Sequence, residues 1–239
     1  MEGNLIREVR FLKAYALVSS VLLAGLIVVG AKPDAKARFG EVDIERINIV
    51  EPDGSIRMVI SDKTRLPGGI IRGKEYAHDR QTAGVLFFND EGTENGGLIF
   101  GGRKEKDGTT TSYGGLSFDA YEQDEVLTLT ARQAGGMKSS GLALIDRPDF
   151  PIVEAFEALA RIKELPKDRQ KAEWEKFLAS KPVPLSRLYL GRGADDSVGL
   201  RLLDPQGRER IQIQVGKDGT PVIKFLDASG RIVSQLPQK

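Results

Sequence analysis

The sequence predicts a mainly β protein of repeated short antiparallel strands and hairpins, with an N-terminal transmembrane helix and a helical hairpin insertion. Three observations lead to this expectation. Short runs of alternating apolar residues end at turn residues, which is the pattern of half-buried strands. Glycine contributes 27 residues whereas aromatic residues make up only 7%, a balance that favours strands and turns over a helical bundle. An uncharged run near the N-terminus has the length of a membrane span.

That run is residues 14–31, AYALVSSVLLAGLIVVGA. Its length is close to the minimum that crosses roughly 30 Å of hydrocarbon. Three interpretations compete: a retained anchor, a signal peptide cleaved near residues 35–37, and a buried soluble helix. Charges at Lys32 and Asp34 separate the apolar run from the small-x-small site, which favours the anchor. Residues 1–13 are then a cytoplasmic tail.

The orientation of this anchor depends on its flanks. Three basic residues lie close to the span on each side, so the positive-inside rule gives a near tie. The short basic tail is similar to the first part of a signal sequence, which favours a cytoplasmic N-terminus. We therefore expect a single-pass protein of the bacterial cytoplasmic membrane, with the bulk of the chain outside the cytoplasm. Residues 32–41 are a polar spacer.

The first β-repeat segment, residues 42–148, begins with the run ERINIVEPDGSIRMVIS at Glu45–Ser61. It predicts two alternating strands joined by a Pro-Asp-Gly turn. The isoleucines of the first strand share one face with Met58 and Ile60, because strand side chains alternate. Arg57 lies on the opposite face.

The same unit recurs along the chain, including the C-terminal β-repeat segment, residues 183–239. An Arg follows two of the turns at the same offset, Arg57 and Arg210. A second form, Gly-apolar-x-apolar, recurs at irregular spacing, which does not fit a strict solenoid period. The aligned runs are INIVEPDG at 47–54, VLFFNDEG at 85–92, LRLLDPQG at 200–207 and IKFLDASG at 223–230. Strands are predicted near 43–50, 55–61, 83–89, 96–101, 113–119, 125–131, 140–146, 186–191, 198–204, 209–215, 221–226 and 230–235.

Residues 149–182 predict the helical hairpin. Apolar residues recur at helical spacing from Ile152 to Ile162, and Pro166 ends this first helix. A second helix near 168–180 has Trp174 on its apolar side. The hairpin either caps edge strands of the sheet or forms a partner-binding lobe, and capping is the simpler expectation.

Composition excludes several classes of function. The chain has no cysteine, so disulfides, thiol nucleophiles and thiolate metal sites are excluded. Beyond residue 31 it has 32 basic and 32 acidic residues, and such a balance lacks the positive surface that nucleic acid requires. Neither a cofactor motif nor a catalytic signature is present. We therefore expect no cofactor and no enzymatic activity.

Three further features have simple explanations. His78 is the only histidine, and an ordinary loop position explains it better than catalysis does. The run GGIIRGK at 68–74 matches part of a phosphate-binding loop, but Glu75 stands where that loop needs Ser or Thr, and no strand leads into it. The basic residues between Arg65 and Arg80 are expected to form a solvated loop.

Two acidic clusters are the remaining candidates for chemistry. The first offers oxygen ligands to a calcium ion, but it lacks the spacing of the helix-loop-helix calcium motif, and a polar turn explains it without a metal. The second would serve glycoside hydrolysis if two of its carboxyl groups faced a cleft. Nothing in the sequence places them opposite one another, so no catalytic or metal site is assigned. The first cluster is Asp90, Glu91 and Glu94, and the second is Asp119, Glu122, Asp124 and Glu125.

Three runs together resemble a family of uncharacterised bacterial proteins with one N-terminal membrane segment: RFGEVDIERINIVEPDGSIRMVIS, GGIIRGKEYAHDR and GVLFFNDEGTENGGLIFGGRK. The C-terminal run GLRLLDPQGRERIQIQVGKDGTPVIKFLDASG resembles bacterial repeats of the form D-x-x-G-x-x-R. The resemblance covers most of residues 38–146 and 186–235. It implies an envelope-anchored β-repeat protein and attaches no activity to it, so no catalytic residues follow from it.

The expected function is a non-enzymatic, membrane-anchored structural or interaction module of the bacterial envelope. It would contact the lipid bilayer through residues 14–31, and it would bind a protein partner or another copy of itself through sheet edges. The alternative is an envelope carbohydrate-binding protein or hydrolase that uses the clustered carboxylates.

Overall fold

The structure is a computed structural model that describes residues 2–30, 36–77 and 80–238. The chain divides into two compact units, Met1–Asp43 and Ile44–Lys239, and each is described by itself. His78 lies outside the described residues, so its environment is not assigned.

The first unit contains helix α1, Glu2–Gly30. Within the part of the chain that the structure describes, no helix has both the length and the hydropathy of a membrane span. The predicted span at 14–31 extends past that part, because residue 31 and the side chains of 26–30 lie outside it.

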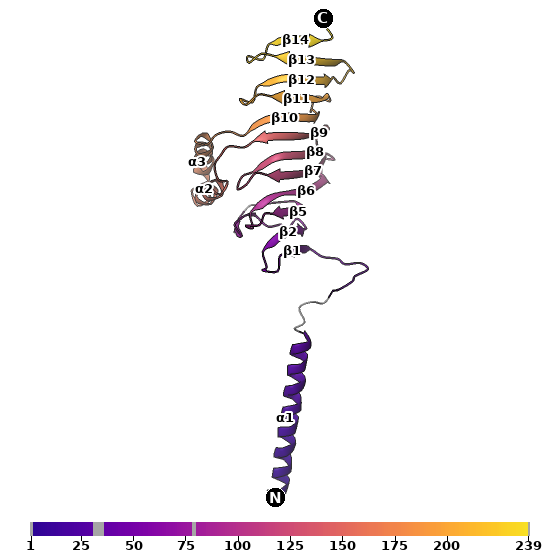
Figure 1. Ribbon diagram of the computed structural model, residues 1–239, viewed down its shortest axis with the longest axis vertical. Helices are drawn as coiled ribbons and strands as arrows, with labels where there is room; N and C mark the ends of the chain where they lie inside the picture. The colour runs from indigo at the N-terminus through magenta and orange to yellow at the C-terminus, as the bar shows by residue number, and fades with distance from the viewer. Residues whose placement is uncertain (1, 31–35, 78–79, 239) are drawn as a thin grey trace. The chain divides into compact units, whose positions relative to one another are not determined.

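The second unit is built on one antiparallel sheet of twelve strands, which pair in the order in which they occur in the chain (Figure 1). The prediction of a mainly β fold is confirmed, and each predicted strand corresponds to a strand of this sheet. A separate two-stranded hairpin, β3 and β4, was missed. The sheet consists of β1 (Arg46–Val50), β2 (Ile56–Ser61), β5 (Ala83–Phe88), β6 (Glu94–Lys104), β7 (Thr110–Asp119), β8 (Glu125–Ala134), β9 (Met137–Asp146), β10 (Leu185–Arg192), β11 (Val198–Leu203), β12 (Glu209–Val215), β13 (Pro221–Leu226) and β14 (Ile232–Leu236), and the hairpin of β3 (Gly69–Ile71) and β4 (Lys74–Tyr76).

The aligned repeats share one turn geometry. At the β11–β12 turn, the carbonyl of Asp204 accepts a hydrogen bond from the N–H of Gly207, and the N–H of Asp204 donates to the carbonyl of Arg208. Gly207 has a φ of 73°, which favours glycine. The same pair of backbone bonds begins at Glu51, Asn89 and Asp227. The repeat alignment is therefore confirmed as a recurring hairpin turn.

Arg57 and Arg210 fasten consecutive turns to each other. Arg57 forms ion pairs with Glu51 in its own turn, at 3.3 Å, and with Asp90 in the next turn along the sheet, at 2.7 Å. The Nε of Arg210 donates to the carbonyl of Leu226, and its guanidinium lies 3.5 Å from Asp204. The two arginines at matching offsets thus have one structural role at the turn edge of the sheet.

The buried core lies on one face of the N-terminal strands. Val59 and Leu86 of the sheet are almost fully buried, and they cluster with Leu66 and Ile70 from the segment that crosses this face. Phe88 completes the cluster. The core therefore covers one face of the sheet at its N-terminal end.

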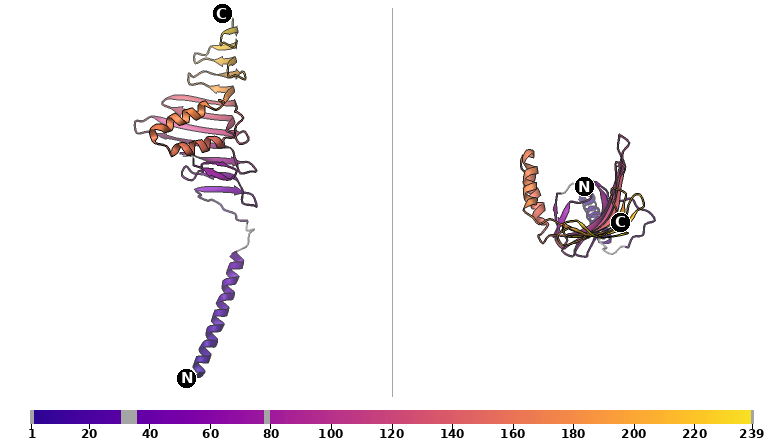
Figure 2. Two further views of the ribbon diagram at one scale, coloured as in Figure 1. Left: turned by 90° about the vertical axis from the view of Figure 1, so that its left-hand side faces the viewer. Right: turned by 90° about the horizontal axis from the view of Figure 1, so that it is seen from above.

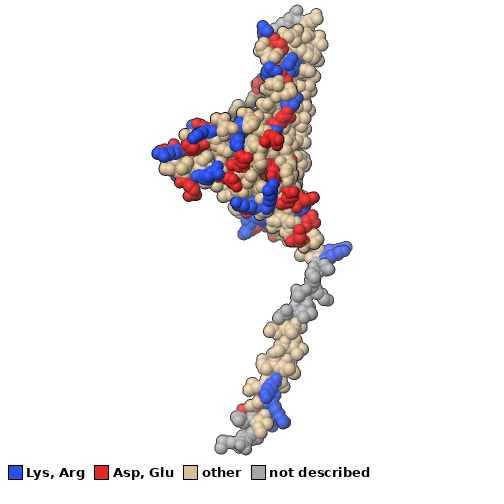
Figure 3. All heavy atoms as spheres, turned by 60° about the vertical axis from the view of Figure 1, so that its left-hand side comes forward, with Lys and Arg blue, Asp and Glu red and all other residues tan. Residues whose placement is uncertain are grey.

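The helical hairpin consists of α2 (Val153–Lys163) and α3 (Lys167–Ala179). Phe156 of α2 contacts Tyr76 of β4, with 5.5 Å between ring centroids. Seen from above, the sheet is curved and the two helices stand on its concave side (Figure 2). Charged side chains are dense on the outer surface of these helices (Figure 3).

The expectation that this hairpin caps edge strands is wrong. The edge strands are β1 and β14, whereas the helices are inserted between β9 and β10 in the middle of the strand order. Phe156 is held by packing against the β3–β4 hairpin, where a Cβ on Gly69 would lie 2.4 Å from its ring. The helices therefore stand over a face of the sheet.

Candidate functional site

One face of the sheet carries an unbroken row of aliphatic residues. The register places one apolar side chain of each strand directly opposite one of the next strand, from the first strand to the last. We call this the first apolar row. It runs Ile47, Ile60, Val85, Leu98, Leu116, Leu129, Leu142, Leu190, Leu200, Ile213, Ile223 and Leu236.

A second apolar row lies beside the first on the same face. Only Gly96 and Ser234 interrupt its apolar character. We call the two rows together the apolar face. The second row runs Ile49, Met58, Phe87, Gly96, Phe118, Leu127, Leu144, Leu188, Leu202, Ile211, Phe225 and Ser234.

The side chains of the apolar face are exposed or half-buried along its whole length, and none is fully buried. Leu98, Leu190 and Ile213 are 40%, 51% and 44% exposed. Across the part of the chain that the structure describes, strands β10–β14 pack against their neighbouring strands and no second layer lies on them. A monomeric soluble protein seldom leaves so large a continuous apolar surface in contact with water.

The opposite face differs between the two ends of the sheet. At the N-terminal end it carries the buried core. At the C-terminal end it is polar. In each strand, the residue between the two members of the apolar rows points to the opposite face, and these residues are Tyr189, Arg201, Gln212, Lys224 and Gln235. Strands β10–β14 are therefore amphipathic, with a solvated polar face and an uncovered apolar face.

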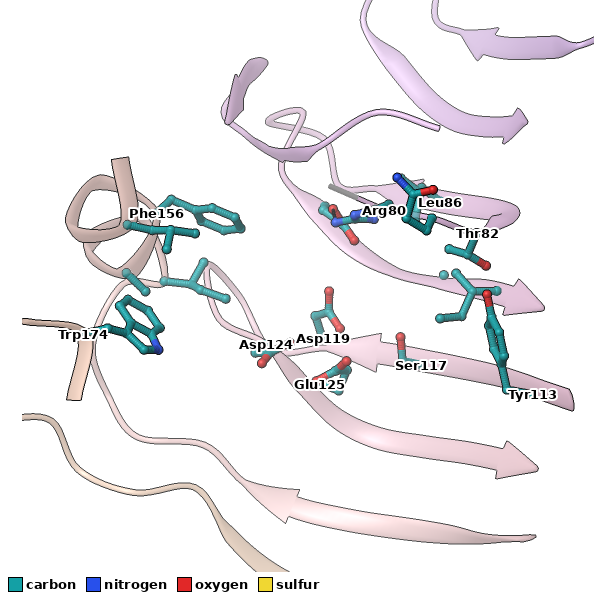
Figure 4. A pocket seen from close by; sticks show the side chains of 17 residues that line it. Arg80, Thr82, Leu86, Tyr113, Ser117, Asp119, Asp124, Glu125, Phe156 and Trp174 are labelled. Atoms are coloured by element: carbon teal, nitrogen blue, oxygen red, sulfur yellow. Dashed lines mark hydrogen bonds and ion pairs between the residues drawn. The ribbon is translucent and has the colours of Figure 1, made fainter. Parts of the chain in front are cut away.

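A cavity of about 650 Å³ lies on this opposite face, between the sheet and α2. This volume is in the usual range of small-molecule sites. Leu86, Ile99 and Phe156 line its apolar wall, and Trp174 reaches it from α3. Figure 4 shows Phe156 and Trp174 on one side and Asp119 with Glu125 on the other.

Asp119 and Glu125 are paired positions at the ends of β7 and β8. The register shifts after Phe118, which pairs with Leu127, so Val126 is an extra residue in β8. This bulge brings Glu125 opposite Asp119, because without it Val126 would take that place. The two carboxyl groups therefore both line the cavity.

Burial and, to a smaller extent, the negative charges of Glu94, Glu125 and Asp124 raise the pKa of Asp119 to about 8, while the charge of Arg147 opposes the shift. Its Oδ1 is buried and has no hydrogen-bond partner among the described residues. At neutral pH this carboxyl group is mostly protonated. It can then donate a hydrogen bond or a proton to a bound molecule.

Burial, together with a hydrogen bond to Asp124 and the charge of that residue, raises the pKa of Glu125 to about 7. Arg147 opposes these effects by forming an ion pair with Glu125 at 2.7 Å. Arg80 and Glu94 form a second half-buried pair at 2.6 Å on the cavity wall. The cavity therefore combines protonatable carboxyl groups with fixed charges.

The first acidic cluster does not converge. Asp90 pairs with Arg57 at 2.7 Å, and Glu91 accepts a hydrogen bond from the hydroxyl of Tyr121. Of the three, Glu94 alone lines the cavity. Among the described residues, no group of three or more His, Cys, Asp or Glu side chains has the geometry to hold a metal ion.

The second acidic cluster converges in part. Asp119, Asp124 and Glu125 line the cavity, whereas Glu122 pairs with Arg72. Sequence reasoning missed Arg80 and the place of Trp174 in the wall. A signal for Trp174 was present, since it is the only tryptophan of the chain and lies on an apolar helix side.

The run at 68–74 forms the β3–β4 hairpin, and its backbone amides are occupied. The N–H of Gly68 donates to Glu75, and the N–H of Arg72 donates to the hydroxyl of Thr93. Arg72 and Gly73 both have positive φ, as a tight hairpin turn requires. These amides are therefore not directed at a phosphate group.

Comparison with protein-family models and with curated proteins finds no match to this chain.

Proposed function

We propose that the chain is a non-enzymatic, membrane-anchored interaction module of the bacterial envelope, and that its apolar face is the binding surface. The observation that carries this proposal is the first apolar row, which crosses all twelve strands without a polar residue and whose side chains are exposed or half-buried. An antiparallel sheet is stable with one face in water when that face is polar and the other is buried. In β10–β14 the apolar face is left uncovered by the described residues, as well as the polar one.

The proposed anchor is residues 14–31. Its support is the uncharged apolar sequence, which has the length of a single membrane span. A basic tail before it supports a cytoplasmic N-terminus. A reporter enzyme that is active only outside the cytoplasm, fused after the C-terminal residue, should be active. An inactive fusion with normal expression would reverse the orientation.

The absence of cysteine allows a direct test of the binding surface. We would compare Ile213→Cys, on the apolar face, with Gln212→Cys, its neighbour on the polar face of the same strand. Both variants would be treated with a membrane-impermeant maleimide in intact envelopes and, as a reference, after denaturation. Relative to its denatured reference, the Ile213→Cys variant should react at least several-fold more slowly than the Gln212→Cys variant.

The reason is that Ile213 is 44% exposed in the isolated chain, so protection at this position requires a partner. Equal labelling of the two variants would show that the face is open in the envelope. The interaction function would then be rejected.

The second candidate function is an envelope carbohydrate-binding protein or hydrolase. The cavity favours it, because Asp119, Asp124 and Glu125 converge there with Trp174. A sugar ring could stack on the indole, while the protonated Asp119 donates to a glycosidic oxygen.

Trp174 reports on this site without labelling, since its fluorescence is the only tryptophan signal of the chain. Titration with N-acetylglucosamine oligomers and with glucose oligomers should shift its emission in a saturable way. The Asp119→Asn variant should keep this shift and lose any hydrolysis. An unchanged emission with every sugar would remove this candidate.

A further inference from the structure

We propose that the apolar face is covered by the same face of a second copy of this chain. This inference rests on the proposed function, because it names the partner of that surface. Three properties of the face support a second copy: its composition, its area and the tethering of the chain at one end.

The composition makes the face compatible with itself. Neither apolar row contains a charged residue, so two identical faces can meet without like-charge repulsion. Most positions are Leu or Ile, whose side chains interdigitate when two sheets pack about 10 Å apart. A different partner would need an equally long, uncharged complement.

The area is close to what a stable pair of proteins requires. Twelve strands at about 4.8 Å spacing give a face roughly 55 Å long, and two rows with their side chains are roughly 12 Å wide. Each copy would then bury on the order of 650 Å², near the roughly 800 Å² per partner of a standard interface. Phe100 and Val198, exposed at 54% and 47%, extend the face beside the first row.

Tethering sets the orientation of the two copies. Both chains would enter the same membrane through residues that precede Ile44, so both sheets begin at the same end. A two-fold axis parallel to the direction of strand stacking satisfies this condition. Each strand then faces its own counterpart, and with the axis running along the first apolar row, a residue of that row meets the same residue of the other copy.

The decisive experiment uses the full chain purified in mild detergent. Mass photometry should give two chains per particle after the detergent contribution is subtracted. A bismaleimide that bridges roughly 10 Å should crosslink the Ile60→Cys variant to itself and the Ile213→Cys variant to itself. The matched Gln212→Cys variant should remain uncrosslinked, because its side chain is on the other face.

A mixture of the two row variants, carrying different tags, tests the orientation. Crosslinks between Ile60→Cys and Ile213→Cys chains, without self-crosslinks, would indicate opposed copies and overturn the proposed arrangement. A monomer without crosslinks would overturn the second copy as partner. A ladder of growing oligomers with no crosslink at either row position would assign association to the sheet edges instead.

A charged substitution provides independent evidence. Leu190→Lys should convert the pair to monomers, whereas Gln212→Lys on the polar face should leave the pair intact. Circular dichroism must show unchanged strand content for both variants. If Leu190→Lys fails to fold, the crosslinking of the conservative Cys variants still decides the question.

The outcomes separate this inference from the proposed function. Protection of Ile213→Cys in the envelope together with a purified monomer would keep the interaction function and reject the second copy. Full labelling of Ile213→Cys in the envelope would reject both.

Discussion

The rings of Phe87 and Phe118 stack across Gly96, with 6.2 Å between centroids and 16° between planes. The three residues are consecutive members of the second apolar row. Gly96 has no side chain, so the two rings close over the gap that it leaves in the row. This arrangement keeps the apolar face continuous at the one internal position where the row has no apolar side chain.

Replacing Gly96 with Ala should destabilise the sheet by roughly 1–3 kcal/mol. Its φ is 123°, and an added Cβ would lie 2.3 Å from the carbonyl oxygen of Ser117. Chemical denaturation measures the loss. Gly114→Ala is the matched control on the same face, because its Cβ would meet no atom closer than 3.9 Å. Equal effects of the two substitutions would contradict this account of Gly96.

The stability of the fold should fall as the pH rises from about 4 to about 8. An unfolded Asp ionises near pH 3.9, whereas Asp119 in the fold has a pKa of about 8. Between these values the folded state binds more protons than the unfolded state, so raising the pH favours unfolding. Glu125, with a pKa of about 7, acts in the same direction.

The melting temperature, measured from pH 5 to pH 9, should therefore decrease and level off above pH 8. The Asp119→Asn variant should melt higher than the natural chain at pH 8 and depend less on pH. The turn carboxyl of Asp227 does not interfere, since its hydrogen bond with Ser229 and those with Arg231 hold its pKa at about 2. A variant with unchanged pH dependence would place the titration elsewhere.

Replacing Phe156 with Ala should cost about 2 kcal/mol, at the lower end of large-to-small changes because the ring is only partly buried. Its contact with Tyr76 fastens α2 to the β3–β4 hairpin. Hydrogen exchange should show faster exchange in α2 and α3 while β10–β14 stay unchanged. Leu178→Ala on α3, where the side chain is 49% exposed, should change stability by less than about 0.5 kcal/mol.

Replacing Arg210 with Met should cost about 1 kcal/mol, because the carbonyl of Leu226 loses its side-chain donor. Lys should not restore it, since the bridge to Asp204 uses the fork of a guanidinium. Hydrogen exchange at the β13–β14 turn is the local readout. Arg231→Met, at a side chain that is 82% exposed, should have little effect. A larger loss for Arg231→Met would contradict the role of Arg210.

Much of the fold was predictable because its signals are local. Each strand of the large sheet shows alternation within its own residues, and each aligned turn carries its own glycine. β3 and β4 were missed because three residues are too few to show a period. The continuation of β6 beyond Gly101 was missed because Gly101 and Gly102 interrupt the apolar pattern, although both pair with β7.

Some residues of the candidate cavity could be predicted from the sequence, but their arrangement could not. Asp119 and Glu125 were recognised as members of one acidic loop, but their facing arrangement depends on the bulge at Val126. The wall formed by Phe156 depends on packing against Tyr76, which is far away in the sequence. Neither the bulge nor the long-range contact leaves a pattern in the neighbouring sequence from which it could be predicted.

The sequence by itself determined which residues form strands, where the chain turns and which side chains of a strand share a face. These properties follow from a period of two residues and from turn chemistry, both of which act over a few positions. Only the tertiary structure decided that the twelve strands pair in chain order. It also decided the register of each pair, which places one aliphatic residue of every strand in a continuous row. It also decided that α2 and α3 stand over the opposite face. Both depend on contacts between strands and helices that no local pattern encodes.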